Sequence, residues 1–376
     1  MSKLKELHKY GQSPWYDNIE RGLLLSGKIK EMIVDDGITG LTSNPTIFEK
    51  AINGSKLYDA DIERLSREGK DAQAIYDELT TWDIDKAADV LLEVYTSSGR
   101  KDGFVSIEVS PHLAHDTEAT IAEAKRLYGK ISRANVMIKV PATIEGVEAI
   151  RKLTLLGINV NATLVFSLTH YSAVSEAYIS GLEERISKGM PVDMINSVAS
   201  LFVSRIDTYI DRLLNERVIK NHDEKKMRDM EGLSGKAAVA QAKIIYDAYR
   251  RTFYTPQFKS YISGGAKVQR LLFGSTSTKN PSYSDVKYVE ELIAEGTINT
   301  MPSITIEAFK DHGVPQAALI GNVTAEASEI LAKLRTYGVA IEEVCQKIQD
   351  DGLQAFTDSY DKLIRSLEKK RLTFIS

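Results

Sequence analysis

The sequence predicts an α/β fold and, within that class, a (β/α)8 TIM barrel with extra helices inserted and a helical C-terminal extension. Short apolar runs alternate with longer amphipathic stretches, which is the pattern of parallel βαβ units. The runs Met137–Val140 and Ala162–Phe166 are almost continuously apolar, as expected of strands buried on both faces. Eight such runs occur, which favours a closed barrel over the alternative, an open doubly wound sheet.

The expected strands follow one another at fairly regular intervals along the chain. In order they are Trp15–Ile19, Ile38–Thr42, Phe104–Val109, Val136–Val140, Ile158–Val165, Val198–Val203, Val268–Gly274 and Thr297–Met301. Helical patterns between the later strands are Thr117–Tyr128, Ile144–Leu155, Leu168–Arg185, Ile206–Asn215 and Gly235–Tyr249. The charged run Asn221–Glu231 is expected to be a solvated surface segment.

Two regions depart from simple strand–helix alternation. The gap from 43 to 103 is too long for one helix and predicts three: Asp59–Ser66, Asp71–Glu78 and Asp83–Tyr95. Beyond the last strand the patterns Ala325–Thr336, Val339–Gln349 and Leu353–Lys370 predict helices that pack on the barrel. The chain contains no repeat and no proline-rich linker. We therefore expect one domain over residues 1–376, with a barrel core at about 12–310 and C-terminal helices at about 311–376.

Composition excludes several classes of protein. The 376 residues are 43% hydrophobic and 27% charged, with a net charge of −4, which argues against disorder and against nucleic-acid binding. The single cysteine, Cys345, cannot form an internal disulfide, as is typical of a reducing compartment. No apolar run approaches the ~20 residues of a membrane span, and the charged amino terminus does not resemble a secretion signal. We expect a soluble cytoplasmic protein.

In a parallel barrel the active site lies at the carboxyl ends of the strands. Polar residues expected at or near those ends are Asp17, Asn44, Glu108, Lys139, Asn161, Thr163, Ser200, Arg205, Ser275, Lys279 and Thr300. They combine acids, an amine, and several amide and hydroxyl groups, while Arg205 and Lys279 could hold a phosphate. This set predicts a site for a small polar ligand.

Lys139 is the most informative of these residues. It lies in an apolar strand, where partial desolvation favours the neutral, nucleophilic amine that Schiff-base chemistry requires. Glu108 could then shuttle protons and Asp17 could be a second acid/base. The structural alternatives are a lysine whose ammonium reaches water at the strand end, and carboxylates that only form ion pairs, for example with Lys139.

Other patterns give weaker support for a metal or a cofactor. Glu108, His112, His115 and Asp116 lie close together in the sequence, but such groupings are common by chance, so we expect no metal site. The loop Gly274–Asn280 lacks the Gly-Lys-Ser/Thr ending of an ATP-binding loop, and no G-x-G-x-x-G fingerprint of a dinucleotide site occurs. We therefore expect no cofactor.

Seven segments together resemble the transaldolase family, a family of class I aldolases that act through a Schiff base. In family order they are Trp15–Ile19, Leu41–Phe48, Ser106–Pro111, Ile138–Thr143, Ile158–Ser167, Ser200–Arg205 and Asn299–Pro302. The resemblance covers about residues 12–310, and the chain is similar to the longer bacterial forms of the family. It implies a metal-free transferase on an α/β barrel.

The resemblance also implies roles for individual residues. Lys139 matches the Schiff-base lysine and Asp17 the acid/base of carbon–carbon cleavage. Glu108 matches an acid that works through a bound water, and Thr163 the hydroxyl that holds this water.

The resemblance also implies which residues bind the substrate. Asn44 and Asn161 match amides that bind the dihydroxyacetone portion, and Ser200 and Arg205 match donor-binding and phosphate-binding positions. The chain departs from the short members at the seventh strand, where they have Ser-x-Arg. Here Ser275 is followed by Ser277, and the nearest cation is Lys279, which can bind phosphate only as a point charge.

The implied activity is transfer of a dihydroxyacetone unit from sedoheptulose 7-phosphate or fructose 6-phosphate to glyceraldehyde 3-phosphate or erythrose 4-phosphate, in the pentose phosphate pathway. The alternatives are an aldolase that releases free dihydroxyacetone, and a barrel that binds sugar phosphates without catalysis. Related fructose 6-phosphate aldolases have glutamine and tyrosine where this chain has Glu108 and Phe202, which favours transfer. The expected partners are sugar phosphates, and the protein is expected to be a monomer or a homodimer.

Overall fold

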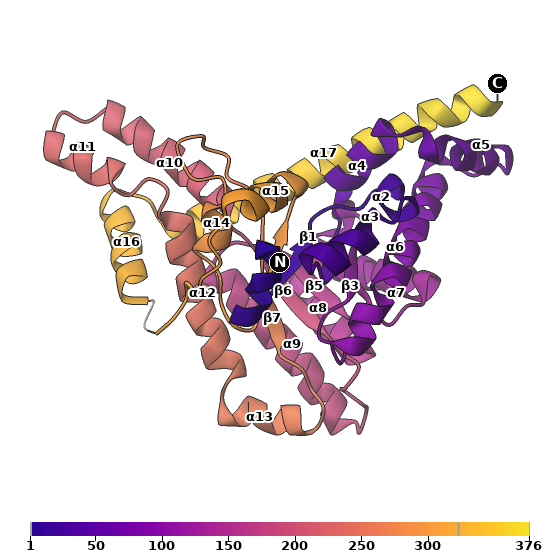
Figure 1. Cartoon of the computed structure of the whole chain (residues 1–376), viewed down its shortest axis with the longest axis horizontal. Helices are drawn as coiled ribbons and strands as arrows, with labels where there is room; N and C mark the ends of the chain where they lie inside the picture. The colour runs from indigo at the N-terminus through magenta and orange to yellow at the C-terminus, as the bar shows by residue number, and fades with distance from the viewer. Residues whose placement is uncertain (1, 322–323, 376) are drawn as a thin grey trace.

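The computed structural model describes residues 2–321 and 324–375 and has a closed parallel barrel at its centre (Figure 1). The strands are hydrogen-bonded in chain order, and β8 pairs with β1, which confirms the predicted TIM barrel. They are β1 Gln12–Tyr16, β2 Gly40–Thr42, β3 Phe104–Glu108, β4 Val136–Pro141, β5 Val160–Val165, β6 Ser197–Phe202, β7 Gln269–Gly274 and β8 Thr297–Met301. One domain over 1–376 stays a prediction, and residues 1, 322–323 and 376 lie outside the described residues.

The first strand begins earlier than the sequence predicted. Seven strands agree with their predicted bounds to within two residues, but β1 covers Gln12–Tyr16 and not Trp15–Ile19. The polar residues before Trp15 are buried inside the strand because they have partners there. The side-chain amide of Gln12 donates to Leu292 O at 2.7 Å and to Thr297 Oγ1 at 2.9 Å. Asp17 therefore follows the strand end directly.

Helices surround the barrel. They are α1 Lys3–Glu6, α2 Arg21–Leu25, α3 Lys28–Glu31, α4 Pro45–Gly54, α5 Asp59–Arg67, α6 Ala72–Ser97, α7 Thr117–Ile131, α8 Ile144–Leu156, α9 Leu168–Ser187, α10 Ser204–Ile219, α11 Glu224–Glu231, α12 Ala237–Phe253, α13 Pro256–Ser263, α14 Lys287–Glu290, α15 Ser303–His312, α16 Thr324–Thr336 and α17 Ile341–Ile375. Their starts follow local chemistry: the side chains of Asp116, Thr143 and Ser167 cap α7, α8 and α9 by accepting backbone N–H bonds.

Two predicted helix breaks do not exist. The segments Asp71–Glu78 and Asp83–Tyr95 belong to one helix, α6, with Asp71 as its N-cap. The hydroxyls of Thr80 and Thr81 donate to carbonyls one turn earlier, so these polar side chains are satisfied within the helix. Val339–Gln349 and Leu353–Lys370 were predicted as two helices, but α17 runs unbroken through Gly352.

Helix α17 crosses the barrel and continues beside the α4–α6 insertion. In Figure 1 it runs as a long yellow helix past α4 towards α5, and it contacts α4, α5, α6 and α10. The carbonyls of Ala142 and Leu164 accept hydrogen bonds from Gln349 of α17, at 3.0 and 2.9 Å. Leu164 lies in a β-bulge with a positive φ of 56°, so α17 supports an irregular strand end.

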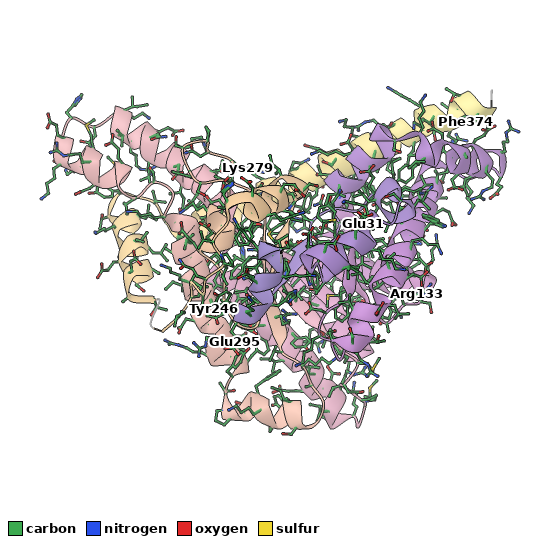
Figure 2. The ribbon with its side chains drawn as sticks, in the orientation of Figure 1. Glu31, Arg133, Tyr246, Lys279, Glu295 and Phe374 are labelled. Atoms are coloured by element: carbon green, nitrogen blue, oxygen red, sulfur yellow. The ribbon has the colours of Figure 1, made fainter. Side chains whose placement is uncertain are left out.

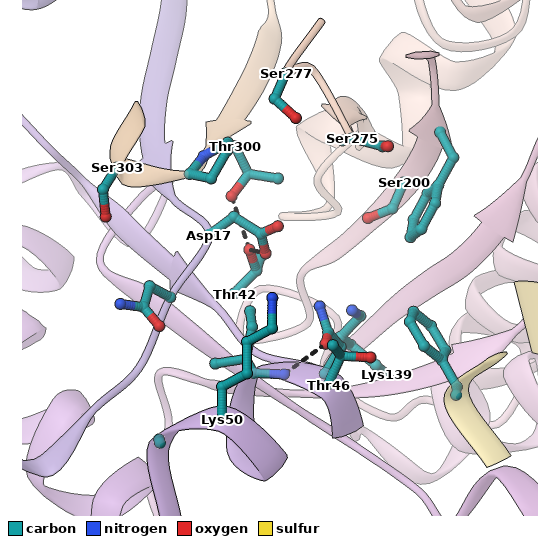
Figure 3. A pocket seen from close by; sticks show the side chains of 18 of the residues that line it. Asp17, Thr42, Thr46, Lys50, Lys139, Ser200, Ser275, Ser277, Thr300 and Ser303 are labelled. Atoms are coloured by element: carbon teal, nitrogen blue, oxygen red, sulfur yellow. Dashed lines mark hydrogen bonds between the residues drawn. The ribbon is translucent and has the colours of Figure 1, made fainter. Parts of the chain in front are cut away.

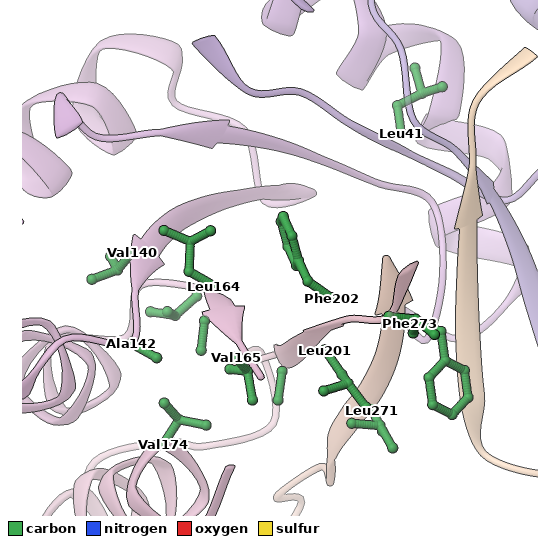
Figure 4. Close-up of a cluster of buried hydrophobic side chains, with 14 of the residues drawn as sticks. Leu41, Val140, Ala142, Leu164, Val165, Val174, Leu201, Phe202, Leu271 and Phe273 are labelled. Carbon is green, nitrogen blue, oxygen red and sulfur yellow. The ribbon is translucent and has the colours of Figure 1, made fainter. Parts of the chain in front are cut away.

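The two faces of the strands have different surroundings. Outward side chains such as Val140, Leu201 and Leu271 pack in one large hydrophobic core (Figure 4). A second buried cluster comprises Trp15, Tyr95, Phe104, Met137, Val198, Leu272 and Ile298, most of them strand residues. Successive strand side chains alternate between faces, so Lys139 lies on the same face as Met137 and two residues closer to the carboxyl end. None of the described helices is long and apolar enough to cross a membrane.

Candidate active site

A cavity of about 590 Å³ opens at the carboxyl ends of the strands (Figure 3). Seven of the ten residues predicted to act in catalysis or binding line it: Asp17, Asn44, Lys139, Ser200, Arg205, Ser275 and Lys279. In Figure 2, Lys279 lies near the upper end of the molecule, whereas Glu295 lies well below it and lines a different cavity. In that second cavity the guanidinium of Arg270 is paired with Asp102 at 3.2 Å, so its charge already has a partner.

The Lys139 amine lies deep in the site and contacts two groups. Its Nζ donates to Ser43 O at 2.9 Å and lies 3.5 Å from Glu108 Oε2. The side chains of Lys139 and Glu108 are only 4% and 6% exposed, and the two residues are paired in register on β4 and β3. The 3.5 Å separation permits an ion pair but is long for a hydrogen bond. The Lys139 amine thus lies beside the Glu108 carboxyl group without forming a short hydrogen bond to it.

Glu108 and Thr163 lie behind the cavity wall. Burial raises the pKa of Glu108 above its usual value, although the neighbouring ammonium of Lys139 opposes this shift. Glu108 Oε2 and Thr163 Oγ1 are both buried, and neither has a hydrogen-bond partner among the described residues. Both atoms can therefore take part in a further hydrogen bond.

Asp17 lies on the other side of the barrel mouth. Its Oδ1 accepts a hydrogen bond of 2.6 Å from Thr42, whose hydroxyl is also 2.7 Å from that of Thr300 (Figure 3). Burial raises the pKa of Asp17 above its usual value, while the hydrogen bond from Thr42 and the charge of Lys139 oppose the shift. A raised pKa makes the ionised carboxylate a stronger base towards a hydroxyl proton than a solvent-exposed aspartate is.

The two asparagines occupy different environments. Asn161 is fully buried and both ends of its amide have partners: Nδ2 donates to Ser106 Oγ at 3.1 Å, and Oδ1 accepts from Ser200 Oγ at 2.6 Å. Asn161 does not line the cavity, so it orients Ser200 from below. Asn44 lines the cavity and caps α4, because its Oδ1 accepts from Ile47 N at 3.0 Å. Its Nδ2 has no acceptor among the described residues.

The far side of the cavity is basic. Arg205, in the first turn of α10, lies over the rings of Phe202 and Phe356 at 5.5 and 5.8 Å. Burial lowers the pKa of Arg205, with the charge of Glu108 opposing the shift. The amine of Lys279 donates to Ser277 Oγ at 2.6 Å.

Ser275 completes this basic side of the cavity. Its backbone is in the left-handed region with a φ of 53°, and its hydroxyl lies 3.0 Å from that of Ser204. A non-glycine residue in this region is uncommon and often occurs at functional sites.

The structure separates the two histidines from Glu108 and brings further residues to the cavity. His112 and His115 do not converge on Glu108, since they pair with Asp361 at 2.7 Å and with Glu145 at 3.3 Å. Lys50 of α4 and Phe356 of α17 line the cavity, although neither was predicted as a site residue. In the sequence of α4, the residues that line the pocket recur at helical spacing, which is a pattern that could have identified Lys50. No local pattern indicated that α17 reaches the site.

Comparison with known proteins assigns the chain to a family. The family model for "Transaldolase/Fructose-6-phosphate aldolase" matches residues 14–367. A transaldolase of Trichodesmium erythraeum is 45% identical over 369 residues, covering 98% of this chain and 97% of its own. A protein named transaldolase 2 from a Nostoc species is 43% identical, with 98% of each chain covered, and a transaldolase of Thiobacillus denitrificans is 44% identical, with 98% and 100% covered. The chain therefore belongs to the transaldolase/fructose-6-phosphate aldolase family.

Proposed function

We propose that this chain is a transaldolase that transfers a dihydroxyacetone unit between sugar phosphates through a Schiff base at Lys139. The observation that carries the proposal is the buried Lys139 amine, 3.5 Å from Glu108 Oε2, at the wall of a polar cavity that also holds Asp17. A buried amine beside a proton donor is the arrangement that attack on a ketone requires. Full-length relatives named transaldolase support the same reaction class.

The first half-reaction forms the covalent intermediate. The neutral amine of Lys139 attacks the C2 ketone of a ketose phosphate and gives a carbinolamine. Glu108, acting through a water held with Thr163, donates the proton with which the C2 hydroxyl leaves as water, so the iminium forms. Support for this relay comes from Glu108 Oε2 and Thr163 Oγ1, two buried atoms without a hydrogen-bond partner among the described residues.

Cleavage and transfer then follow. Asp17 removes the proton of the C4 hydroxyl, the C3–C4 bond breaks, and its electron pair moves into the iminium to give an enamine. The aldose phosphate leaves, and the enamine carbon attacks the aldehyde of a second aldose phosphate while Asp17 returns its proton. The raised pKa of Asp17 suits this exchange. Water then adds to the new iminium, and loss of the Lys139 amine frees the ketose phosphate. Sedoheptulose 7-phosphate and glyceraldehyde 3-phosphate would thus give erythrose 4-phosphate and fructose 6-phosphate, a step of the pentose phosphate pathway.

An aldolase that releases dihydroxyacetone is the second candidate, because the family includes fructose 6-phosphate aldolases. Phe202 argues against it. This side chain lines the cavity and packs edge-on against Phe166 and Phe356, so it offers no hydroxyl to activate water against the enamine. Incubation with fructose 6-phosphate and no acceptor distinguishes the two: steady release of dihydroxyacetone would support the aldolase.

The test of the main proposal is trapping with borohydride in the presence of fructose 6-phosphate, followed by intact and peptide mass spectrometry. We expect a three-carbon adduct on the peptide that contains Lys139. The variant Lys139→Met should fold, because the new side chain suits a buried site, but should give no adduct and no turnover. A six-carbon adduct would mean binding without cleavage and would remove the role of Asp17. The absence of any adduct on folded protein would refute the covalent mechanism.

A further inference from the structure

One face of α4 forms a wall of the cavity. The residues of this helix that line it are Thr46, Ile47, Lys50, Ala51 and Gly54, which recur at the spacing of one helical stripe. Lys50 is the only charged member of this set. Figure 3 shows its side chain rising from α4 into the pocket. Lys50 is therefore placed by the helix on the cavity side.

Lys50, Arg205 and Lys279 all line the cavity and share one electrostatic property. Among the described residues none of the three has a carboxylate within ion-pair distance. Glu49, next to Lys50 on α4, shows the contrast, because it pairs with Lys362 of α17 at 2.8 Å. Counting Lys139, four cations line the cavity against two carboxylates, those of Asp17 and Glu20.

The three cations also affect one another. Burial lowers the pKa of Lys279, and the charges of Arg205 and Lys50 lower it further. Like charges that share a partly buried cavity are unfavourable unless an anion neutralises them. A phosphate dianion has three terminal oxygens, and each can accept a charge-assisted hydrogen bond. The cluster thus has the charge and the number of donors for one phosphate group.

We propose that Lys50 is a phosphate ligand that acts with Arg205 and Lys279 and makes the site select phosphorylated over unphosphorylated sugars. This inference rests on the proposed transaldolase function. Arg205 is the fixed member, because it is packed against Phe202 and Phe356, whereas the two lysines are point charges on flexible stems. The departing and the accepting aldose phosphate occupy the same part of the site, so Lys50 contacts the phosphate in both half-reactions.

The test compares two acceptors in Lys50→Gln, with fructose 6-phosphate as donor. In ping-pong kinetics kcat/KM for the acceptor does not depend on the donor concentration, so an effect on donor binding does not enter. We expect kcat/KM for glyceraldehyde 3-phosphate to fall about 10- to 150-fold, the loss of one charge-assisted hydrogen bond, and that for glyceraldehyde to fall less than about threefold. The matched control is Lys56→Gln, which removes the same charge from an exposed residue outside the cavity and should leave both values unchanged.

Three outcomes would overturn the proposal, and they are distinguishable. If kcat/KM in Lys50→Gln falls equally for both acceptors, Lys50 has a structural role only. If kcat/KM falls for neither acceptor, Lys50 does not contact the substrate. Borohydride trapping with dihydroxyacetone, which has no phosphate, separates these results from failure of the function itself. If wild-type protein forms no adduct on Lys139, the transaldolase proposal fails and this inference falls with it. If the adduct forms but acceptor selectivity is unchanged in Lys50→Gln, only the role of Lys50 is wrong.

Discussion

Gly352 offers a direct test of whether α17 sets the position of Arg205. A Cβ at this position would lie 2.8 Å from Arg205 Nη1 and 3.2 Å from Leu164 Cδ2. The first distance is too short for a real contact, so in Gly352→Ala the guanidinium must move. The clash involves the end of the Arg205 side chain, so the guanidinium is displaced from its packed position over Phe202 and Phe356. The substitution in α17, which lies outside the barrel, thus displaces Arg205, a cation that lines the cavity.

The expected changes in stability and in activity have different magnitudes. Alanine is favoured over glycine in a helix interior by about 1 kcal/mol, and modest overpacking costs about 1–3 kcal/mol, so the free energy of unfolding should change by no more than about 2 kcal/mol. Loss of a hydrogen bond from Arg205 to phosphate costs about 1.5–3 kcal/mol. We therefore expect kcat/KM for glyceraldehyde 3-phosphate to fall roughly 10- to 150-fold.

The assay combines urea unfolding with acceptor kinetics. Gly129→Ala is the matched control, because Gly129 lies in α7 and an added Cβ would meet nothing within 4 Å. It should gain up to about 1 kcal/mol of stability with unchanged kinetics. A wild-type value of kcat/KM in Gly352→Ala would show that Arg205 either stays in place or does not contact the substrate phosphate.

Two other substitutions test the acid/base group and the barrel interior. In Thr42→Val, Asp17 loses the 2.6 Å hydrogen bond that lowers its pKa, so the pKa should rise further. Because Asp17 must be ionised to accept a proton, the acid limb of the kcat–pH profile should move to higher pH; a limb that stays or moves to lower pH would contradict this role. In Gly40→Ala, the added Cβ would lie 2.4 Å from the ring of Trp15, which is fully buried and donates to Asp102 at 2.9 Å. We expect a loss of about 3 kcal/mol or more in urea unfolding, and unchanged stability would mean that this ring can shift.

Local pattern was sufficient for the barrel and for much of the site. A strand buried on both faces has few polar residues, so a polar side chain at its carboxyl end, such as Lys139 or Glu108, is conspicuous in the sequence. The parallel topology then brings these ends together. This is why seven of the predicted residues line one cavity, and why the strand bounds other than those of β1 were predicted closely.

Predictions from local sequence pattern were wrong where a contact between distant residues determines the bounds of a helix or strand. The break expected at Gly352 is absent because α17 packs against Arg205 and Leu164 at that point, and glycine permits the close approach. The first strand includes Gln12 because its amide has partners from distant loops and strands.

The fold class, the family resemblance and the set of polar strand ends could be predicted from the sequence, because they depend on strand–helix alternation and on short motifs along the chain. Which groups share the cavity depends on how distant segments pack. The tertiary structure placed Asn161 below Ser200, put Glu108 behind the wall beside Lys139, and brought Lys50 of α4 and Phe356 of α17 to the mouth. The physical reason is that burial, the pairing of charges and the packing of helices arise between residues far apart in the chain, and no local pattern contains them.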